Sequence, residues 1–535
     1  MYDLLLQGGT VYDGLGAPGR TADVAIEDGS VAAVGSDLGD ARRTIAADGL
    51  AVAPGFIDPH SHSDGIPLLD EPQPFKLLQG VTTEITGNCG FSLAPLSSEA
   101  AAEVAETWSD LTGPAGIRPG SFAELLDRLA AAGPTNHLAV LVGHNTLRLT
   151  ANGMDRDLRP GALAEMQDLA AEAFAAGAAG LSSGLLYPPG SFGDTEELVA
   201  LATVAHRFGR PYTTHMRDEG RALDAALDEA IEIGTRARVP VQISHCKAAG
   251  RASHGRSELL LDRLHRARAA GVDVRGDQYP YLAGSTFLSA MLPGAAHEGG
   301  VAALTARLRD PGERARLREQ AEDGTTATGT GEWREVTPED VLVVSHRDPA
   351  YVGRTLAQLV ELIGGPGDDG WDTLCELVLA DPAAMMVITL MAEPDVQAIM
   401  RDPLISVGSD NALPFGLQHP RTWGCFPRFL GHYVRERELV TWPEAIRKVT
   451  SGSAAQFGLT GRGWLGPGAV ADICVFDPAT IGHDGTYLEP DRPPTGVEYV
   501  VLAGAVVVDG GRFGGERRGE ILRLGPGHGG DGPAT

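Results

Sequence analysis

Cysteine is scarce in this chain of 535 residues. Its five cysteines lie far apart and form no Cys-x-x-Cys pair or dense framework; they are Cys89, Cys246, Cys375, Cys425 and Cys474. Widely spaced cysteines in a long chain are typical of a reducing compartment, so a disulfide-stabilised fold is not expected. The N-terminal segment has no basic stretch followed by a long apolar run, which argues against a signal peptide. We therefore expect a cytoplasmic protein.

Long apolar runs and an excess of positive charge are also missing. No run reaches the roughly 18–20 apolar residues that a membrane-spanning helix needs. The 43 basic and 71 acidic side chains give a net charge of −28. Such a surface repels phosphate groups, so we expect neither nucleic acid nor an anionic membrane as a partner. The apolar fraction of 43% is ordinary for a globular protein, and the length favours two or more domains.

The two ends of the chain share one texture. Residues 22–26 and 31–34 read as strands around the hairpin signal Glu27-Asp-Gly-Ser30, and residues 471–476 and 497–502 read as strands near the other end. This predicts one small β-sandwich domain built from residues 1–55 and 456–520. Residues 521–535 are expected to form a disordered tail, because Gly and Pro are abundant there.

The middle of the chain, residues 56–455, alternates apolar strands with helical patterns. This alternation is typical of βα units, and eight of them predict an α/β fold with a TIM-like (β/α)8 barrel. The stretch between the seventh and eighth strands, about residues 283–403, is long. Its charged segment 303–322 predicts a helical insertion, about residues 283–350, over the barrel mouth. The predicted barrel strands are 56–60, 81–86, 138–142, 180–186, 211–214, 239–244, 272–278 and 404–408.

Residues of the types that bind metals follow five of these predicted strands. In a barrel of this kind, functional groups lie at the carboxyl ends of the strands. Each residue alone has an ordinary structural explanation: a hydrogen-bonded histidine, a small buried cysteine or a helix-capping aspartate. Their occurrence together at matching positions indicates a metal site, since imidazole and thiolate are preferred ligands of zinc-class ions. The six residues are His60, His62, Cys89, His215, His245 and Asp410.

Neighbouring residues are sorted by the alternation of side chains along a strand. Cys246 follows a candidate histidine directly and should point the other way, whereas Lys247 returns to the ligand side and could reach a substrate. Tyr279 and Tyr281 could do the same, with Pro280 between them leaving their directions open. His144, after the third strand, could support the site, although a structural role is favoured.

These motifs make the chain similar to the amidohydrolase superfamily, and more closely to the N-acyl-D-amino-acid deacylases, the D-aminoacylases. The resemblance extends over nearly the whole chain, and the Gly-Asn-Cys-Gly element is its most specific part. Many amidohydrolases bridge two metals with a carboxylated lysine on the fourth strand, and the fourth strand here has none. The matching motifs are Pro54-Gly-Phe-Ile-Asp-Pro-His-Ser-His62, Gly87-Asn-Cys-Gly-Phe-Ser92, Gly180-Leu-Ser-Ser-Gly-Leu-Leu-Tyr-Pro-Pro189, Thr214-His-Met-Arg-Asp-Glu219, Ser244-His-Cys-Lys247, Tyr279-Pro-Tyr281, Gly408-Ser-Asp410 and His419-Pro-Arg421.

The resemblance implies a role for each residue. It implies a tight zinc ion held by Cys89, His215 and His245. A weaker second metal site would use His60, His62 and Asp410, with Cys89 shared. Asp410 would also be catalytic, taking a proton from water and passing it to the leaving amine. The α-carboxylate of the substrate would be bound by Lys247, Tyr279 and Arg421.

The implied activity is zinc-dependent hydrolysis of N-acyl-D-amino acids to a carboxylate and a free D-amino acid. The loop 282–293 is apolar and lacks Lys and Arg, which favours neutral or hydrophobic D-amino acids. One alternative is cleavage of a cyclic amide, which the missing lysine disfavours. Another is cleavage of a dipeptide that ends in a D-residue. A non-catalytic scaffold is disfavoured because all six ligands are present. A glycine-rich cofactor-binding loop at residues 8–16 is the least favoured interpretation, because its glycine spacing does not match such a loop.

Overall fold

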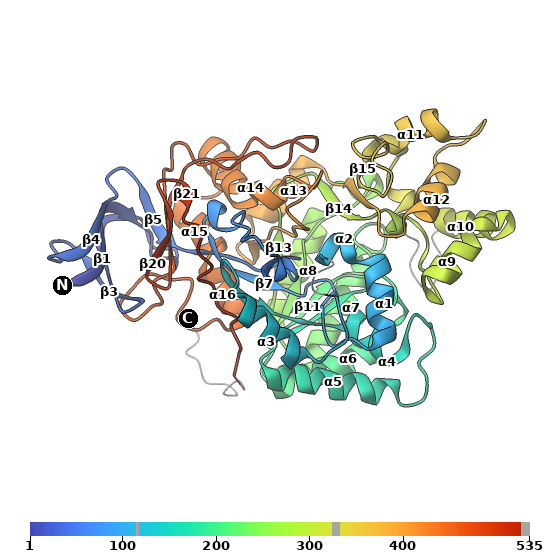
Figure 1. Cartoon of the computed structure of the whole chain (residues 1–535), viewed down its shortest axis with the longest axis horizontal. Helices are drawn as coiled ribbons and strands as arrows, with labels where there is room; N and C mark the ends of the chain where they lie inside the picture. Colours follow the sequence, from blue (N-terminus) through green and yellow to red (C-terminus); the bar gives the residue numbers. More distant parts are fainter. Residues whose placement is uncertain (114–116, 324–331, 526–535) are drawn as a thin grey trace.

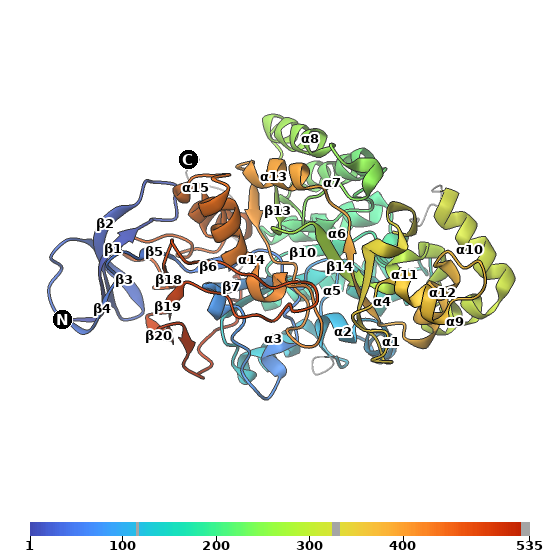
Figure 2. The ribbon, with the colours of Figure 1, turned by 90° about the horizontal axis from the view of Figure 1, so that it is seen from above.

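The structure, a computed structural model, describes residues 1–113, 117–323 and 332–525 of the chain (Figure 1). Figures 1 and 2 show three parts along the long axis: a β-sheet at one end, parallel strands and helices in the middle, and a helical insertion at the other end. None of the helices in the described ranges is long and apolar enough to cross a membrane. All five cysteines are buried and free, as expected from their spacing.

Both ends of the chain build the first sheet, as predicted. Its strands form a single mixed sheet, in the order β21-β20-β19-β18-β5-β1-β2-β3 with β4 beside β1, rather than the two separate sheets of a sandwich. The hairpin between β2 and β3 turns at Asp28 and Gly29, which both have a positive φ, as a tight two-residue turn requires. The strands are β1 (Tyr2–Val11), β2 (Arg20–Glu27), β3 (Ser30–Gly35), β4 (Ala41–Ala46), β5 (Ala51–Pro54), β18 (Ile473–Phe476), β19 (Val497–Leu502), β20 (Ala505–Asp509) and β21 (Arg512–Phe513).

All eight predicted barrel segments contain a parallel strand. Strands β6-β7-β8 form one sheet, and β17-β13-β12-β11-β10-β9 form another. Only Leu141 separates β8 from β9, and a parallel bridge from Ser61 to Asn411 links the chain just after β6 to the chain just after β17. The strands are β6 (Phe56–Asp58), β7 (Val81–Thr86), β8 (His137–Val140), β9 (Val142–Gly143), β10 (Leu181–Gly184), β11 (Tyr212–His215), β12 (Val241–Ile243), β13 (Val274–Gln278) and β17 (Ile405–Val407).

Helices between these strands cover them with apolar faces. In α7 (Leu223–Ala237) the buried residues Leu223, Leu227 and Ala230 recur at helical spacing and enter a core with the strand residues Tyr212 and Val241. The helices are α1 (Ser98–Thr107), α3 (Phe122–Ala132), α4 (His144–Asn152), α5 (Ala162–Ala176), α6 (Thr195–Arg207), α7 (Leu223–Ala237), α8 (Ser257–Ala269), α13 (Glu393–Arg401), α14 (Arg421–Arg428), α15 (Trp442–Lys448) and α16 (Ser451–Phe457).

The insertion lies between β13 and β17, where the sequence predicts it. The charged segment forms two helices rather than one, because Pro311 can begin a helix but cannot continue one. A small antiparallel sheet, β14-β16-β15, joins these helices to the rest of the chain. The elements are β14 (Ala283–Phe287), α9 (Gly300–Arg309), α10 (Pro311–Asp323), β15 (Val341–Ser345), α11 (Leu356–Ile363), α12 (Trp371–Ala380) and β16 (Met385–Thr389).

Residues 521–525, expected as the start of a disordered tail, contact the folded chain instead. Ile521 forms a parallel bridge with Leu138, and the Leu524 amide donates to the Gly177 carbonyl at 3.1 Å. Ile521, Leu522 and Leu524 are apolar, so these residues gain burial by covering the edge of β8. The remainder of the predicted tail, residues 526–535, lies outside the described residues.

Candidate metal centre

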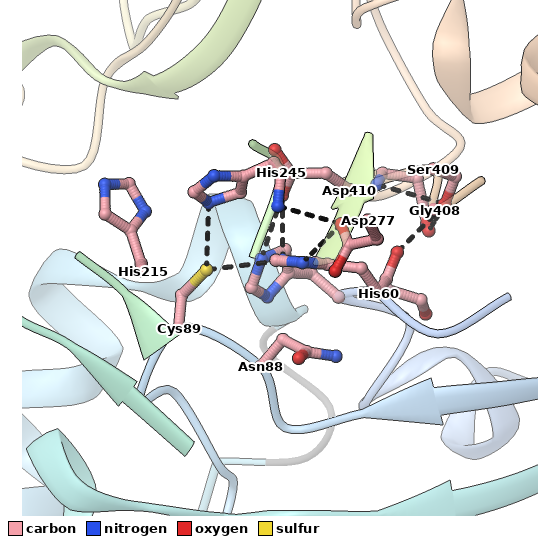
Figure 3. A network of polar contacts seen from close by, with 12 residues as sticks. His60, Asn88, Cys89, His215, His245, Asp277, Gly408, Ser409 and Asp410 are labelled. Atoms are coloured by element: carbon pink, nitrogen blue, oxygen red, sulfur yellow. Dashed lines mark hydrogen bonds and ion pairs between the residues drawn. The ribbon is translucent and has the colours of Figure 1, made fainter. Parts of the chain in front are cut away.

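The six candidate ligands converge at the carboxyl ends of the parallel strands. His60 and His62 follow β6, Cys89 follows β7, His215 ends β11, His245 follows β12 and Asp410 follows β17. Figure 3 shows five of them, His60, Cys89, His215, His245 and Asp410, gathered in one place. The residues come from positions up to 350 apart in sequence, so the fold itself assembles this cluster.

The spacing of the ligand atoms fits a bound metal ion. Cys89 Sγ lies 3.3 Å from His60 Nε2 and 3.6 Å from His245 Nε2. Asp410 Oδ1 lies 3.3 Å from the Nε2 atoms of both His60 and His62. Ligands about 2.0–2.3 Å from one tetrahedral centre lie about 3.3–3.7 Å apart. Ligand atoms of His60, Cys89, His245 and Asp410 all lie within 4.8 Å of one another.

A second group contains a residue that the sequence did not single out. Ligand atoms of His215, Glu219 and His245 also lie within 4.8 Å of one another. Within the described part of the chain, neither ring nitrogen of His215 has a partner in hydrogen-bonding geometry, although the ring is buried. A buried polar atom without a partner is costly, and a metal ion would satisfy it. The two groups share His245 and so adjoin each other, and the second contains His215 and His245, two of the three predicted tight ligands.

Backbone strain marks the same residues. Cys89, His245 and Asp410 have φ values of 52°, 35° and 48°, a region that residues other than glycine seldom adopt and that costs about 1–3 kcal/mol each. The motif around Cys89 needs its glycines, because a Cβ on Gly90 would lie 2.0 Å from Asn145 Oδ1. A Cβ on Gly87 would lie 2.3 Å from the Leu141 carbonyl oxygen. The Gly-Asn-Cys-Gly sequence is therefore a tight turn that presents the thiol.

Buried carboxylates hold the ligands in place. Asp277 on β13 lies 3.3 Å from His60 Nδ1 and accepts the backbone N–H of His245 at 2.8 Å. Glu219 Oε1 lies 2.9 Å from His245 Nδ1. Such contacts fix the orientation of an imidazole and leave its other nitrogen free for a metal. Asp58, at the end of β6, accepts the backbone N–H groups of His60 and Ser409, so it ties the two strand ends together.

The electrostatics of the centre favour a cation. Burial opposes ionisation of Cys89, yet the charge of His60 holds the pKa of the thiol well below its usual range. Burial likewise opposes ionisation of Asp410, yet Arg421 and His60 hold the pKa of its carboxyl well below its usual range. Burial works against protonation of His60, but the charges of Cys89 and Asp277 raise its pKa well above the usual value. A bound divalent cation would balance the negative charges of Cys89 and Asp410 in place of the proton on His60.

A cavity of about 530 Å³, here called the metal cavity, opens above the centre. The described residues that line it include His62, Cys89, His215, His245 and Asp410. Lys247 and Tyr279 line it as well, and the Arg421 guanidinium lies 4.5 Å over the Tyr279 ring. The three predicted substrate-binding residues, Lys247, Tyr279 and Arg421, are thus brought together beside the metal centre.

Both cations of this trio are already paired with acids. The Lys247 ammonium lies 2.7 Å from each carboxylate oxygen of Glu219, and Arg421 Nη1 lies 2.9 Å from Asp410 Oδ2. The charges of Lys247 and Arg421 are therefore balanced by protein acids, and a substrate carboxylate would share these two cations with Glu219 and Asp410.

Three other residues of the sequence analysis lie away from the metal cavity. Cys246 is buried in the apolar core, as strand alternation predicts. Tyr281 packs against His419, at 4.9 Å between ring centroids. His144 lies 2.6 Å from Glu197, which also pairs with Arg148, so its contacts are structural.

Parallel strands that carry His, Cys and Asp side chains at their carboxyl ends define a metal-dependent amidohydrolase. The model of the amidohydrolase family (Amidohydro_3) matches residues 43–508. D-aminoacylase of Alcaligenes xylosoxydans xylosoxydans is 38% identical, over 97% of both chains. N-acyl-D-aspartate deacylase of the same organism is also 38% identical, over 98% of this chain and 95% of that one. The chain belongs to the D-aminoacylase family of the amidohydrolase superfamily.

Solved structures agree with the sequence comparison. A crystal structure of D-aminoacylase is similar with a TM-score of 0.84 and 37% identity, covering 98% of this chain and all of that one. N-acyl-D-glutamate deacylase of Bordetella bronchiseptica, in complex with zinc and a phosphonate inhibitor, has a TM-score of 0.80 and 33% identity. That match covers 98% of this chain and 99% of the other.

Proposed function

We propose that this protein is a zinc-dependent deacylase that hydrolyses N-acyl-D-amino acids to a carboxylate and a free D-amino acid. The observation that carries the proposal is the Cys89 thiol set among histidines and Asp410, beside Lys247, Tyr279 and Arg421. The relatives named above are deacylases of D-amino acids, and one of them was crystallised with zinc. A thiolate with imidazoles is a donor set that zinc prefers.

The residues present suit two metal positions of unequal role. Cys89, His215 and His245 would hold the tight zinc, and His60, His62 and Asp410 would form the weaker position with Cys89 shared. A study of D-aminoacylase describes one-metal activation and second-metal attenuation in that protein, which supports this division. When bound, zinc supplies Lewis acidity to a carbonyl oxygen. Glu219 and Asp277 would keep the imidazoles in the required orientation.

Asp410 is the proposed acid–base group. Its carboxylate faces the cavity and is held by Arg421, which keeps it ionised. In that state it accepts a proton from the attacking water and later returns the proton to the leaving amine. Lys247, Tyr279 and Arg421 position the α-carboxylate of the substrate, so that the amide lies over the metal centre.

We further propose that the parallel strands close into a (β/α)8 barrel. The Ser61–Asn411 bridge supports closure on one side, and the continuous run from β8 to β9 supports it on the other. We place the barrel at residues 56–455 and the small β-domain at 1–55 and 456–520. Closure brings all eight strand ends to one face, as the cluster of ligands requires.

The cavity favours neutral or hydrophobic D-amino acids. Gly284, Ser285 and Thr286, in the segment expected to be a loop and found as strand β14, line the metal cavity together with Ile388 of the paired strand β16 and Leu390 just after it. Among the described residues of that lining, Lys247 is the one Lys or Arg, and it is paired with Glu219. A second carboxylate on the substrate would therefore lack a partner.

A substrate panel with zinc and with a chelator tests the proposed function. We expect hydrolysis of N-acetyl-D-leucine and N-acetyl-D-methionine, at least about 100-fold slower hydrolysis of the L-isomers, and loss of activity on chelation that zinc reverses. Turnover is measured by release of free amine. Faster turnover of hydantoins or of D-dipeptides than of N-acyl-D-amino acids would show that those compounds are the substrates. Equal turnover of both isomers would contradict the proposal.

Glu332 adds an acid to the metal cavity and gives a pH-dependent prediction. Burial, together with the charges of Glu219 and Asp218, raises the pKa of Glu332 to about 8. The group is mostly neutral at pH 7 and ionised at pH 9, where it repels a second carboxylate. We expect kcat/KM for N-acetyl-D-glutamate, relative to N-acetyl-D-leucine, to fall about tenfold between these pH values. Glu332→Gln should make this ratio independent of pH, and an unchanged fall in that variant would contradict the role of Glu332.

A further inference from the structure

A second cavity, here called the apolar cavity, adjoins the metal cavity. Its empty space of about 660 Å³ is partly open to solvent, and it shares the lining residues Phe91, Leu186 and Tyr187 with the metal cavity. Phe91 lies two residues after Cys89, and the centroid of the Tyr187 ring lies 4.8 Å from that of His215. The apolar cavity therefore begins directly beside the metal centre.

The walls of this cavity suit an uncharged occupant. None of the described residues that line it is Lys or Arg. Its polar groups are used by the protein: Glu103 Oε1 accepts the Val301 N–H at 3.0 Å, and His297 Nε2 faces the Ser289 carbonyl at 3.1 Å. Burial lowers the pKa of His297 to about 4, so this ring is neutral. The other walls are mainly apolar and include Trp108, Met154, Phe287, Leu292, Val301 and Leu304.

The insertion supplies one side of the cavity. Helix α1, which follows β7, packs against α9 of the insertion, and the two lie side by side in Figures 1 and 2. Glu103 and Thr107 on α1 face the cavity across from Val301 and Leu304 on α9. The inserted segment thus closes a space next to the metal centre that the parallel strands alone would leave open.

The two ends of an N-acyl-D-amino acid leave the scissile amide in different directions. Lys247 and Tyr279, the groups proposed for the α-carboxylate, line the metal cavity and not the apolar cavity. The acyl chain is bonded to the other side of the carbonyl carbon. With the carboxylate end assigned to Lys247 and Tyr279, we place the acyl chain against the wall of Phe91, Leu186 and Tyr187, which the metal cavity shares with the apolar cavity.

We propose that the apolar cavity binds the acyl chain, and that the enzyme prefers N-acyl groups of medium length, about eight to twelve carbons, over acetyl. This inference rests on the proposed deacylase function and names its acyl group. Burial of each methylene should raise kcat/KM by about fourfold until the cavity is full. We therefore expect N-decanoyl-D-alanine to exceed N-acetyl-D-alanine by at least about 100-fold.

Filling the cavity provides the decisive variant. Val301 is half-buried on α9, so Val301→Trp should occupy the cavity without disturbing the core. We expect this variant to keep wild-type kcat/KM for N-acetyl-D-alanine and to lose at least about tenfold with N-decanoyl-D-alanine. Ala306→Trp, on the exposed face of the same helix, is the matched control and should retain the preference for the long chain.

Two further measurements separate the possible failures. If Val301→Trp slows hydrolysis of N-acetyl-D-tryptophan and spares that of N-decanoyl-D-alanine, the cavity holds the amino-acid side chain and the inference is wrong.

Calorimetric titration with decanoate and acetate needs no turnover. We expect decanoate alone to bind, with heat that Val301→Trp removes. Binding of decanoate without hydrolysis of any N-acyl-D-amino acid would overturn the proposed function and keep the cavity assignment. Hydrolysis of the acetyl substrate without a gain from decanoyl or binding of decanoate would overturn the inference.

Discussion

The variant Asp410→Asn is expected to lose about 100- to 10,000-fold in kcat while it keeps its tightly bound zinc. Asparagine preserves the size of the side chain and can still face the ring nitrogens of His60 and His62, but it cannot accept a proton at neutral pH. The proposed tight ligands, Cys89, His215 and His245, are unchanged. The measurement pairs kcat for N-acetyl-D-leucine with the zinc content of the purified variant.

The control for this variant is Asp348→Asn. Asp348 is exposed, and its carboxylate accepts a hydrogen bond from its own loop, at Ala350 N. Its replacement should leave kcat and zinc content unchanged. Full activity of Asp410→Asn would show that Asp410 does not transfer the proton. Loss of the tight zinc would show that Asp410 acts mainly as a metal ligand. Because Arg421 Nη1 lies 2.9 Å from Asp410, substrate binding should also be followed through KM.

The ligands could be predicted from the sequence because each has a local signal. His60, Cys89, His215, His245 and Asp410 each stand at or just after an apolar strand, and parallel strands bring such positions to one edge. The strands themselves were also predictable, since buried runs of apolar residues alternate with helical patterns. The glycines of the Gly-Asn-Cys-Gly element predict the tight turn at Cys89.

Other parts of the site carry no such signal. Glu219 lies four residues beyond His215, past the end of the strand, and its side chain turns back because of loop geometry that residue spacing does not encode. Asp277 lies within β13, where a buried charge reads as an interruption of an apolar strand rather than as support for His60. The pairing of Lys247 with Glu219 depends on both loops at once. Glu332 comes from the insertion and reaches the cavity through tertiary packing alone.

The variant Cys89→Ala is expected to lose zinc and activity together, with kcat/KM reduced by at least about 1,000-fold. The thiol lies within 3.6 Å of two histidine nitrogens, its pKa is held well below the usual range by the charge of His60, and a thiolate is a preferred ligand of zinc. Alanine leaves the histidines facing an apolar methyl group, and the remaining donors have lost a shared negative charge. Zinc content by mass spectrometry and turnover of N-acetyl-D-leucine should therefore fall in parallel.

Cys246→Ala is the matched control for this loss. Both cysteines are buried and free, but Cys246 lies in the apolar core, where burial raises the pKa of its thiol well above the usual value. Cys246→Ala should keep full zinc and activity at a cost of about 1 kcal/mol in unfolding free energy, seen as a lower Tm. If Cys89→Ala kept full zinc, the metal would be held by the histidines and carboxylates alone. If both variants lost zinc, the loss would follow from damage to the fold and not from the removed thiolate. Only the loss of zinc from Cys89→Ala, with zinc retained in Cys246→Ala, assigns the ligand role to the one thiol that the Gly-Asn-Cys-Gly turn presents.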